Sequence, residues 1–333
     1  MSEPSEPVRW GVLSTAHFAL NRWLPSFQET PGVEGVAIAS RDIEKARAAA
    51  ERFGFPKAYG SYEELLADPE IEAVYIPLPN GLHAEWAIRA AEAGKHVLVE
   101  KPAAADADEA AAMAEAAERA GVRLMEAFMI RHHARWQRAR ALVAEGALGQ
   151  PRLIQAAFCF TLEDPNNVRL KPDLAGGALA DVGCYPVNAA RFLLGAEPLK
   201  AWGVSRDPWG TGVDTTFTGG LKFPQGDLSF ACSFESAFRQ SFTFVGSEGT
   251  LSLNRPFICR DEPVTLTLTN RTGEATEEQI PVGDQYVDQL THLNACIRDP
   301  QRDLWPAENG LASARALDAL RRSARTGRLE DVG

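Results

Sequence analysis

The stretch Val8–Ala19, "VRWGVLSTAHFA", joins a short, largely apolar run to the start of a helical pattern. A dinucleotide-binding fold places its glycine-rich phosphate turn directly after the first strand. Here the positions of the G-x-G-x-x-G pattern hold Ser14, Ala16 and Ala19. These residues are small enough for backbone to approach a pyrophosphate, and the next helix would direct its positive end at that anion. Taken alone, such a degenerate turn is more often an ordinary strand-to-helix connection than a cofactor site.

Strand-like and helical segments alternate downstream, from Val8 to about Ala127. The strand-like runs read "VRWGVL", "VEGVAIAS", "EAVYIPLP", "KHVLVE" and "VRLMEAF". Helical patterns separate them, with glycines 54, 94 and 121 at helix stop positions and Asp106 or Asp108 as an N-cap. The alternation predicts βαβ crossovers, and therefore an α/β Rossmann domain with a doubly wound parallel sheet over residues 8–127.

The pattern changes after Phe128. A helix precedes an irregular loop from Glu163 to Ala175, and the glycine-opened pattern "GGALADVGCYPVNAARFLLG" follows. Successive strand-like runs then predict a large, mostly antiparallel open sheet, with Gly246 and Gly249 supplying positive φ to a hairpin. Helices at about 284–299 and 307–326 complete an α+β domain over residues 128–333. We expect this domain to bind substrate and to form the oligomer. Its last helix can pack against the first domain.

Composition excludes several classes of protein. The 333 residues carry a net charge of −11, which argues against a nucleic-acid partner. No run approaches the ~18 to 20 apolar residues of a membrane span. The segment 1–7 is polar, reads as a disordered tail, and lacks the features of an export signal, so we expect a cytoplasmic protein. The five cysteines form no C-x-x-C pair, and the adjacent His132 and His133 would point apart, so core thiols and no metal site are expected.

The end of the second strand, "IASRDIEKA", bears on the choice of cofactor. NAD sites usually place an acidic residue there for the ribose hydroxyls, whereas NADP sites place a basic residue for the 2′-phosphate. This strand ends with Ser40 and Arg41, and Lys45 follows one helical turn later. Asp42 has the position of a helix N-cap, so NADP is favoured over NAD. The alternative is that Arg41 is only a solvated surface charge.

Three further stretches carry a family resemblance: "YIPLPNGLHAEWAIRAAEAGKHVLVEKP" from Tyr75, "EAFMIRHH" from Glu126, and "GGALADVGCYPVNAARFLLG" from Gly176. From Val8 to about Arg325 the chain resembles the glucose-fructose oxidoreductase and inositol dehydrogenase family. It is most similar to the branch with NADP-dependent D-xylose dehydrogenases and dimeric dihydrodiol dehydrogenases. In that family the segment corresponding to Gly11–Ala19 is the phosphate turn, where backbone amides bind and Ser, Thr or Ala is tolerable.

The resemblance implies two catalytic side chains. Lys101, from the E-K-P signature, would reach the oxygen of the reacting carbon; the alternative is a surface lysine paired with Glu100. Tyr185 stands where many relatives have histidine. As acid/base it would have its pKa lowered by Lys101, and the alternative is a packing residue. Asp181, one turn earlier, would orient Lys101 or bind a substrate hydroxyl, or serve only as a helix N-terminal charge.

The remaining candidates follow from the family and from the ligand-binding ends of parallel strands. The cofactor-side residues are Gly11, Ser14, Thr15, Ala16, His17, Phe18, Ser40, Arg41, Lys45, Pro77, Leu78, Asn80, His83, Glu100 and Lys101. His83 is equally a cap-region histidine. The substrate-side residues are Phe128, Arg131, His132, Asn166, Asn167, Arg169 and Tyr185. Asn188 replaces an aspartate common in the family, which weakens any inference that the substrate is inositol.

These residues predict an NADP-dependent oxidoreductase that oxidises an aldose such as D-xylose at C1 to its lactone. Alternatives are a trans-dihydrodiol dehydrogenase or a dicarbonyl-sugar reductase. Two alternatives belong to other classes of protein: an inactive NADP-binding sensor or scaffold, and a plain sugar-binding module. The resemblance also implies a homodimer or homotetramer formed through the open face of the C-terminal sheet.

Overall fold

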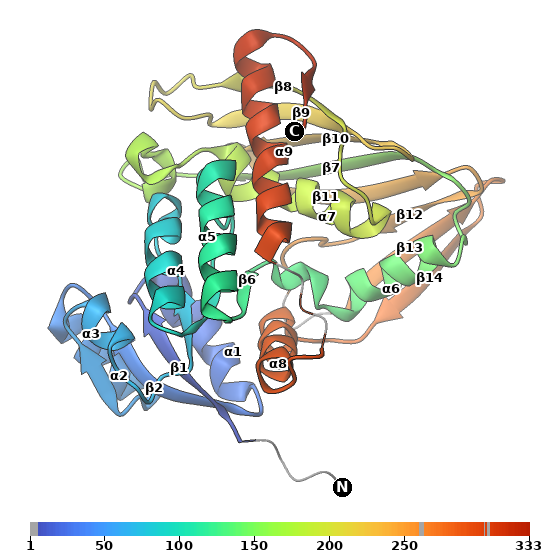
Figure 1. Ribbon diagram of the computed structural model, residues 1–333. Coiled ribbons are helices and arrows are strands. Elements are labelled where there is room, and N and C mark those ends of the chain that lie inside the picture. The colour runs from blue at the N-terminus through green and yellow to red at the C-terminus, as the bar shows by residue number, and fades with distance from the viewer. Residues whose placement is uncertain (1–5, 260–262, 303, 305–306) are drawn as a thin grey trace, which may run out of the picture. The chain divides into compact units, whose positions relative to one another are not determined.

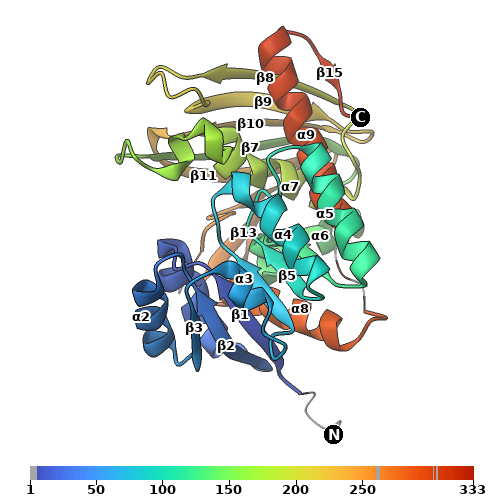
Figure 2. The same cartoon turned by 60° about the vertical axis from the view of Figure 1, so that its left-hand side comes forward.

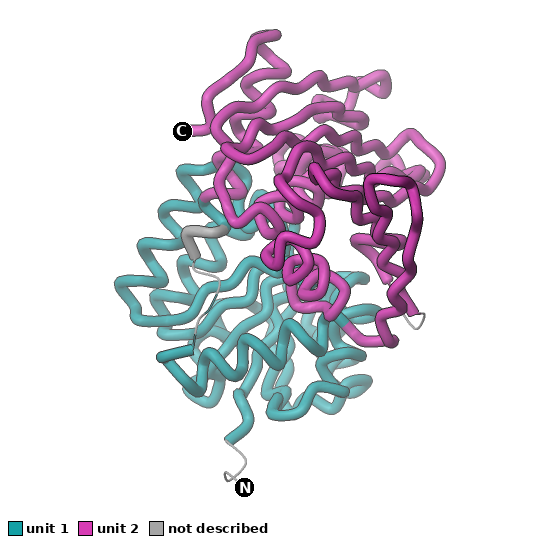
Figure 3. Tube along the Cα trace, turned by 90° about the vertical axis from the view of Figure 1, so that its right-hand side faces the viewer, with its two compact units in different colours: residues 1–129, 285–311 teal, residues 130–284, 312–333 magenta. Residues whose placement is uncertain are grey.

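The computed structural model describes residues 6–259, 263–302, 304 and 307–333, and the chain divides into two compact units (Figure 3). Unit 1 comprises Met1–Met129 and Gln285–Leu311, and unit 2 comprises Ile130–Asp284 and Ala312–Gly333. Most of the predicted tail at 1–7 lies outside the described residues. The backbone carbonyls of Glu6 and Pro7 are described, and both accept hydrogen bonds from Arg298.

Unit 1 contains a six-stranded sheet of described residues in the order β3-β2-β1-β4-β5-β6, and all its strand pairs are parallel (Figure 1). Its strands are β1 Val8–Leu13, β2 Val33–Ala39, β3 Lys57–Tyr59, β4 Ala73–Ile76, β5 His96–Val99 and β6 Leu124–Glu126. Its helices are η1 Ala19–Trp23, α1 Leu24–Glu29, α2 Ile43–Phe53, α3 Tyr62–Leu66, η2 Asn80–Leu82, α4 His83–Glu92, α5 Ala107–Ala120 and α8 Gln285–Arg298. The strand order reverses between β1 and β4, and this is the switch point where doubly wound sheets bind ligands. The predicted Rossmann architecture is confirmed, with β3 as an additional short strand.

Local signals place the helix ends of unit 1 as predicted. The carboxylate of Asp42 accepts hydrogen bonds from the N–H groups of Glu44 and Lys45 at the start of α2. Asp106, rather than Asp108, caps α5. Gly54 and Gly121 end α2 and α5 in the left-handed conformation that glycine adopts without steric cost.

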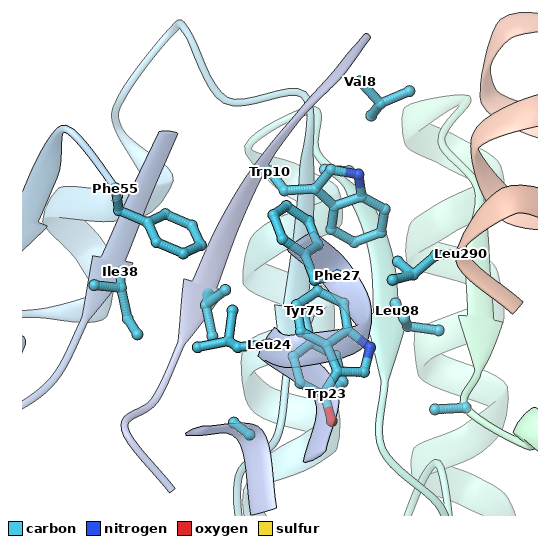
Figure 4. Packing of buried hydrophobic residues seen from close by; sticks show 14 of the residues in the cluster. Val8, Trp10, Trp23, Leu24, Phe27, Ile38, Phe55, Tyr75, Leu98 and Leu290 are labelled. Atoms are coloured by element: carbon cyan, nitrogen blue, oxygen red, sulfur yellow. The ribbon is translucent and has the colours of Figure 1, made fainter. Parts of the chain in front are cut away.

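An aromatic cluster fixes the helix that follows the first turn. Trp23 of η1 stacks on Tyr75 of β4, with ring centroids 3.9 Å apart, and Trp10 of β1 meets Trp23 edge-on (Figure 4). Leu290 of α8 belongs to the same cluster, and the indole N–H of Trp10 donates to Asn294 over 3.1 Å. These contacts explain why α8 belongs to unit 1, although its place in the sequence assigned it to the second domain.

Unit 2 contains a nine-stranded sheet of described residues in the order β14-β13-β12-β11-β7-β10-β9-β8-β15 (Figure 2). Its strands are β7 Pro151–Thr161, β8 Lys200–Arg206, β9 Thr216–Lys222, β10 Asp227–Ser233, β11 Glu235–Gly246, β12 Gly249–Leu253, β13 Val264–Asn270, β14 Ala275–Ile280 and β15 Glu330–Asp331. Its helices are α6 Ala134–Ala144, η4 Val168–Leu170, η5 Pro172–Leu174, η6 Leu179–Gly183 and α7 Cys184–Leu194, and α9 Ala307–Thr326 begins in unit 1 and continues in unit 2. Among the strands that the structure describes in this sheet, only β7 and β10 pair in parallel, so the mostly antiparallel sheet is confirmed. The sequence pattern did not reveal β14, because "ATEEQI" is too charged to resemble a strand.

The predicted hairpin joins β11 to β12, but the reason given for its glycines is wrong. Neither Gly246 nor Gly249 has a positive φ. A Cβ at Gly246 would lie 1.9 Å from the carbonyl oxygen of Leu148, and one at Gly249 would lie 2.6 Å from that of Thr269. Close backbone approach therefore requires these glycines.

Three further findings concern the described residues. All five cysteines are buried free thiols, as the core assignment expects. No helix within the described ranges is long and apolar enough to span a bilayer. In the same part of the chain, no three His, Cys, Asp or Glu side chains group as metal ligands.

Candidate functional site

The turn after β1 is shaped by the residue that replaces the first glycine of the pattern. The Ser14 hydroxyl accepts a hydrogen bond of 3.0 Å from the Ala16 N–H, and the Thr15 hydroxyl donates to Ser40 over 3.4 Å. His17 is exposed, Phe18 is half-buried, and η1 begins directly after them with a π turn. The turn thus keeps small residues and an adjoining helix N-terminus, which is what an approaching phosphate requires.

Gly11 does not belong to this turn. It lies inside β1, where a Cβ would be 2.7 Å from Leu65 Cδ2. Its role is to let α3 pack closely on the sheet, so its assignment to the cofactor is corrected.

The tip of β2 presents basic side chains. Arg41 and Lys45 are exposed, whereas Ser40 is buried and its hydroxyl accepts from the Asp42 N–H over 3.3 Å. The Asp42 carboxylate caps α2 as predicted, which leaves Arg41 as the charged group at the strand tip.

Tyr62 is a member of this site that the sequence did not single out. It is 8% exposed and begins α3, and its phenol lies close enough to Ser14 and Arg41 for both to affect its pKa. Burial raises the pKa of Tyr62, whereas the positive charge of Arg41 and the nearby polar groups of Ser14 and Arg41 oppose the rise. The phenol links the phosphate turn to the β2 tip. Only the N-cap Ser61 marks the place in the sequence, and it indicates a helix start without indicating a ligand.

The turns after β4 and β5 meet at the switch-point side of the sheet. Pro77 and Leu78 are buried, and Asn80 begins η2. Glu100 accepts a 2.7 Å hydrogen bond from the Tyr75 hydroxyl, and its other oxygen accepts from the Lys101 N–H over 3.3 Å. Lys101 is half-buried and is joined to Pro102 by a cis peptide bond.

His83 lies between these two turns and has no exposed surface. Its Nδ1 is 2.8 Å from the Pro102 carbonyl oxygen, and its Nε2 is 2.8 Å from that of Leu78. A ring enclosed in this way cannot line a nicotinamide pocket, so the assignment of His83 to the cofactor is corrected.

In unit 2 the irregular loop folds onto the start of the helix that carries Tyr185. The Arg169 Nε donates to the Asp181 carboxylate over 2.6 Å, and the Asn167 side chain accepts from the N–H of Arg169. The structure thus brings Asn167, Arg169 and Asp181 together. Asn166 is exposed. Among the hydrogen bonds of the described residues, its side chain makes none to this group, and its backbone N–H donates to Asp164.

Asp214 fixes the same helix start, and sequence reasoning missed it. Its carboxylate accepts from the Leu179 N–H over 2.7 Å, and its backbone carbonyl accepts from Ala178. Gly177, at φ +111°, passes so close that a Cβ would lie 2.4 Å from Asp214 Oδ1. Burial raises the pKa of Asp214 to about 6. The glycine pair at 176–177 was the available signal, but it does not say which residue approaches.

The Tyr185 ring packs edge-on against Phe158, with centroids 5.3 Å apart, and tilts against Phe257. The side chain is 6% exposed, so its orientation is held by neighbouring aromatic rings. This restricted orientation suits an acid/base, because proton transfer requires a fixed phenol.

Other substrate-side candidates are more enclosed than expected. Phe128 is 1% exposed and Arg131 is 5% exposed, whereas His132 is half-buried. The Arg131 Nε donates over 2.7 Å to the fully buried Asn188. Asn188 therefore acts as an acceptor for a buried guanidinium, and Arg131 belongs to the interior of unit 2.

The doubly wound sheet, the small-residue turn at its first strand and the basic β2 tip together define a dinucleotide-binding protein with an added α+β unit. The chain belongs to the GFO/IDH/MocA oxidoreductase family. Residues 8–128 match the model described as "Oxidoreductase family, NAD-binding Rossmann fold", and residues 136–252 match the GFO/IDH/MocA C-terminal domain. The predicted family is confirmed, and the protein is an oxidoreductase.

Similar proteins cover nearly the whole chain. A D-xylose 1-dehydrogenase (NADP(+)) of Haloferax volcanii is 40% identical over 96% of this chain and 98% of its own length. The solved aldose-aldose oxidoreductase of Caulobacter crescentus, complexed with glycerol, has a TM-score of 0.91 at 29% identity and covers 98% of this chain and 100% of its own. A 3-ketoreductase of Actinomadura kijaniata in complex with NADP and TDP-benzene has a TM-score of 0.89 at 33% identity, covering 96% and 98%. That ketoreductase was also solved with a tyrosine changed to phenylalanine and with a lysine changed to alanine.

Proposed function

We propose that this oxidoreductase uses NADP to oxidise an aldose such as D-xylose at C1, giving the lactone, with Tyr185 and Lys101 as its catalytic residues. The observation that carries the proposal is that the chain keeps both groups on fixed elements. Lys101 follows β5 at the ligand-binding end of the sheet, and Tyr185 is held by aromatic packing on α7. The xylose dehydrogenase among its relatives favours the aldose.

The residues at the β2 tip fit NADP. Arg41 provides a planar guanidinium for a 2′-phosphate, and Ser40 supplies a hydroxyl beside it. The side chains of Ser14, Thr15 and Ala16 are small enough for a pyrophosphate to approach the backbone of the turn. Tyr62 holds Arg41 and Ser14 in one group. An NAD site would require an acidic ribose ligand here, and Asp42 is already engaged as a helix cap.

When bound, NADP supplies the acceptor for the hydride that leaves C1. The Tyr185 phenolate takes the proton of the C1 hydroxyl, and the Lys101 ammonium stabilises the negative charge that develops on that oxygen. Hydroxyls elsewhere on the sugar would be bound by Asn167, Arg169 and Asp181, which offer fixed donors and acceptors. The products are the lactone, NADPH and a proton.

The reverse direction is a second candidate. The Actinomadura 3-ketoreductase supports reduction of a keto sugar, because the same phenol would then donate a proton to a carbonyl oxygen. Substrate preference separates the two candidates, and also separates both from a dihydrodiol dehydrogenase or an inactive sensor.

The test is the change in reduced-nicotinamide absorbance with a panel of aldoses, keto sugars and dihydrodiols, using NADP and NAD separately. We expect aldose-dependent reduction of NADP, with kcat falling by about 100- to 10,000-fold in Tyr185→Phe. Tyr59→Phe is the matched control, because it removes a phenol that bonds to Asp68. Tight NADP binding without turnover of any substrate would contradict the proposal and favour a sensor.

We further propose that the protein forms a homodimer or homotetramer through the open face of the nine-stranded sheet. Trp202 and Val204 of β8 are 41% and 59% exposed, and Phe238 of β11 is 64% exposed. Aromatic and β-branched side chains that are exposed on the sheet of a single chain are typical of a face that a second subunit covers in the oligomer. Light scattering of the wild type and of Val204→Glu tests this, and an oligomer unaffected by the charge would require another interface.

A further inference from the structure

The fully buried imidazole of His83 joins two turns that the strands themselves do not connect. β4 and β5 are hydrogen-bonded neighbours, and their last connection is the 3.1 Å bond from the Glu100 N–H to the Ile76 carbonyl. Beyond it the backbones part, one into the turn with Leu78 and the other into the turn with Lys101 and Pro102. His83 bridges this opening, with a ring nitrogen 2.8 Å from a carbonyl oxygen on each side.

The ring is neutral at physiological pH. Burial is the main cause that lowers the pKa of His83 to about 4, and the positive charge of Lys101 lowers it further in the same direction. A neutral imidazole has a single N–H, so it donates to one carbonyl and its other nitrogen faces the second.

We propose that His83 is a positioning residue, which holds the turn containing Lys101 and Pro102 so that the Lys101 ammonium is directed at the reacting oxygen. The inference rests on the proposed function of Lys101. His83 itself touches neither cofactor nor substrate, because no part of it is exposed. Its Nδ1 contact with the carbonyl of Pro102, the residue next to Lys101, transmits the constraint in either tautomer.

The experiment compares wild type with His83→Phe and His83→Gln. Phenylalanine keeps a ring of similar size but removes both polar contacts, whereas glutamine retains a single amide group that can donate to one carbonyl. His96→Gln is the matched control. His96 begins β5 at the opposite end of the same strand, and its Nδ1 accepts from the Arg123 N–H. Three quantities are measured: kcat with the best substrate, the Kd for NADP, and the rate at which trinitrobenzenesulfonate modifies Lys101, followed by peptide mass spectrometry with the exposed Lys222 as reference.

We expect kcat to fall by about 100-fold in His83→Phe, as for a misplaced catalytic group, while the Kd for NADP stays close to that of wild type. The modification rate of Lys101 should change relative to Lys222 in His83→Phe, change less in His83→Gln, and stay constant in His96→Gln. If His83→Phe does not fold, His83→Gln carries the comparison alone.

Two results would overturn the inference. One is an unchanged Lys101 modification rate in the His83 variants, which would mean that the ring does not position the lysine. The other is a loss of NADP affinity and kcat in equal proportion, which would indicate general disruption of the unit. The modification assay needs no substrate, so it remains decisive even if wild type turns over no sugar and the proposed function fails.

Discussion

Two helices carry the expected ligand groups, and both contain a π turn close to their start, yet the two starts are held in different ways. Around η1 the turn residues 15–18 are half-buried or exposed, and the Ser14 hydroxyl is their main anchor. At η6 every residue from 177 to 193 is buried, and Asp214 and Arg169 bind the first turn from outside the helix. Single π turns inside helices are frequent at functional sites.

The difference matches the ligands that we propose for the two starts, a pyrophosphate at the first and a sugar at the second. A pyrophosphate is held by backbone N–H groups and a helix dipole, so side chains matter little beyond their size. This explains how Ser and Ala can replace glycines in the first turn. A sugar is held by directed side chains, so under the proposed function Asp181 and Tyr185 would need a rigid support. We therefore expect substitutions to cost much at the second start and little at the first.

Gly177→Ala should have the largest effect on stability. The added methyl group would lie 2.4 Å from the Asp214 carboxylate, and the alanine backbone would have to adopt φ +111°. We expect a loss of about 2–4 kcal/mol in the free energy of unfolding, measured with urea. Gly210→Ala is the control, because its φ is +66° and nothing lies within 4 Å of the added carbon. Equal losses in the two variants would show that the η6 start is not tightly supported.

Asp214→Asn should change how stability depends on pH. Burial raises the pKa of Asp214 from 3.8 to about 6, so the folded state favours the protonated acid. The stabilisation by this group is complete below its ordinary pKa and is lost as the pH rises through about 6. Relative to wild type, the variant should therefore gain on the order of 2–3 kcal/mol between about pH 4 and pH 8.

Asp207→Asn should change the pH dependence of stability in the opposite direction, and it therefore serves as the contrast to Asp214→Asn. Burial raises the pKa of Asp207, but bonds from Thr211 and Gly212 outweigh it and the pKa is lowered. Its stabilisation is present at neutral pH and is lost on acidification. Parallel pH curves for the two variants would refute the assignment for Asp214.

Arg41→Ala tests the charge beside the first start. Loss of a charge-assisted bond to the 2′-phosphate should raise the Kd for NADP by about 10- to 100-fold while that for NAD stays the same. Cofactor fluorescence titration measures both constants. Arg47→Ala is the control, since that exposed arginine on α2 pairs with Glu44. A similar increase in the Kd for NAD would mean that Arg41 does not bind the 2′-phosphate.

Ser14→Ala should have the smallest effect. It removes the bond to the Ala16 N–H, which is worth about 1 kcal/mol, and the turn keeps small residues. We expect thermal unfolding to shift slightly and the Kd for NADP to change by about tenfold at most. Asp106→Ala removes a similar side-chain-to-backbone bond, the cap of α5, and should leave the cofactor affinity unchanged. A larger loss of affinity would show that the hydroxyl itself contacts the phosphate.

Local patterns in the sequence were sufficient for the first sheet, the β2 tip and most helix ends. Asp42, Asp106, Gly54 and Gly121 act within one helical turn of their own positions, so spacing alone indicates their roles. The parallel order also follows from local information, because alternation of strands and helices permits few topologies. The family motifs likewise single out Lys101 and Tyr185, whose catalytic roles are part of the proposed function.

The tertiary structure decided what depends on residues far apart in the chain. In the sequence His83 resembles a ligand-facing histidine. In the structure its ring instead contacts the carbonyl oxygen of Pro102, which is 19 residues away in the chain. Tyr62 joins Ser14 and Arg41, and Asp214 reaches the η6 start across 35 residues. Packing around Trp10 likewise places α8 in unit 1. Such contacts leave no periodicity or cap signal in the sequence, because the partner residues meet only when separate elements pack against one another.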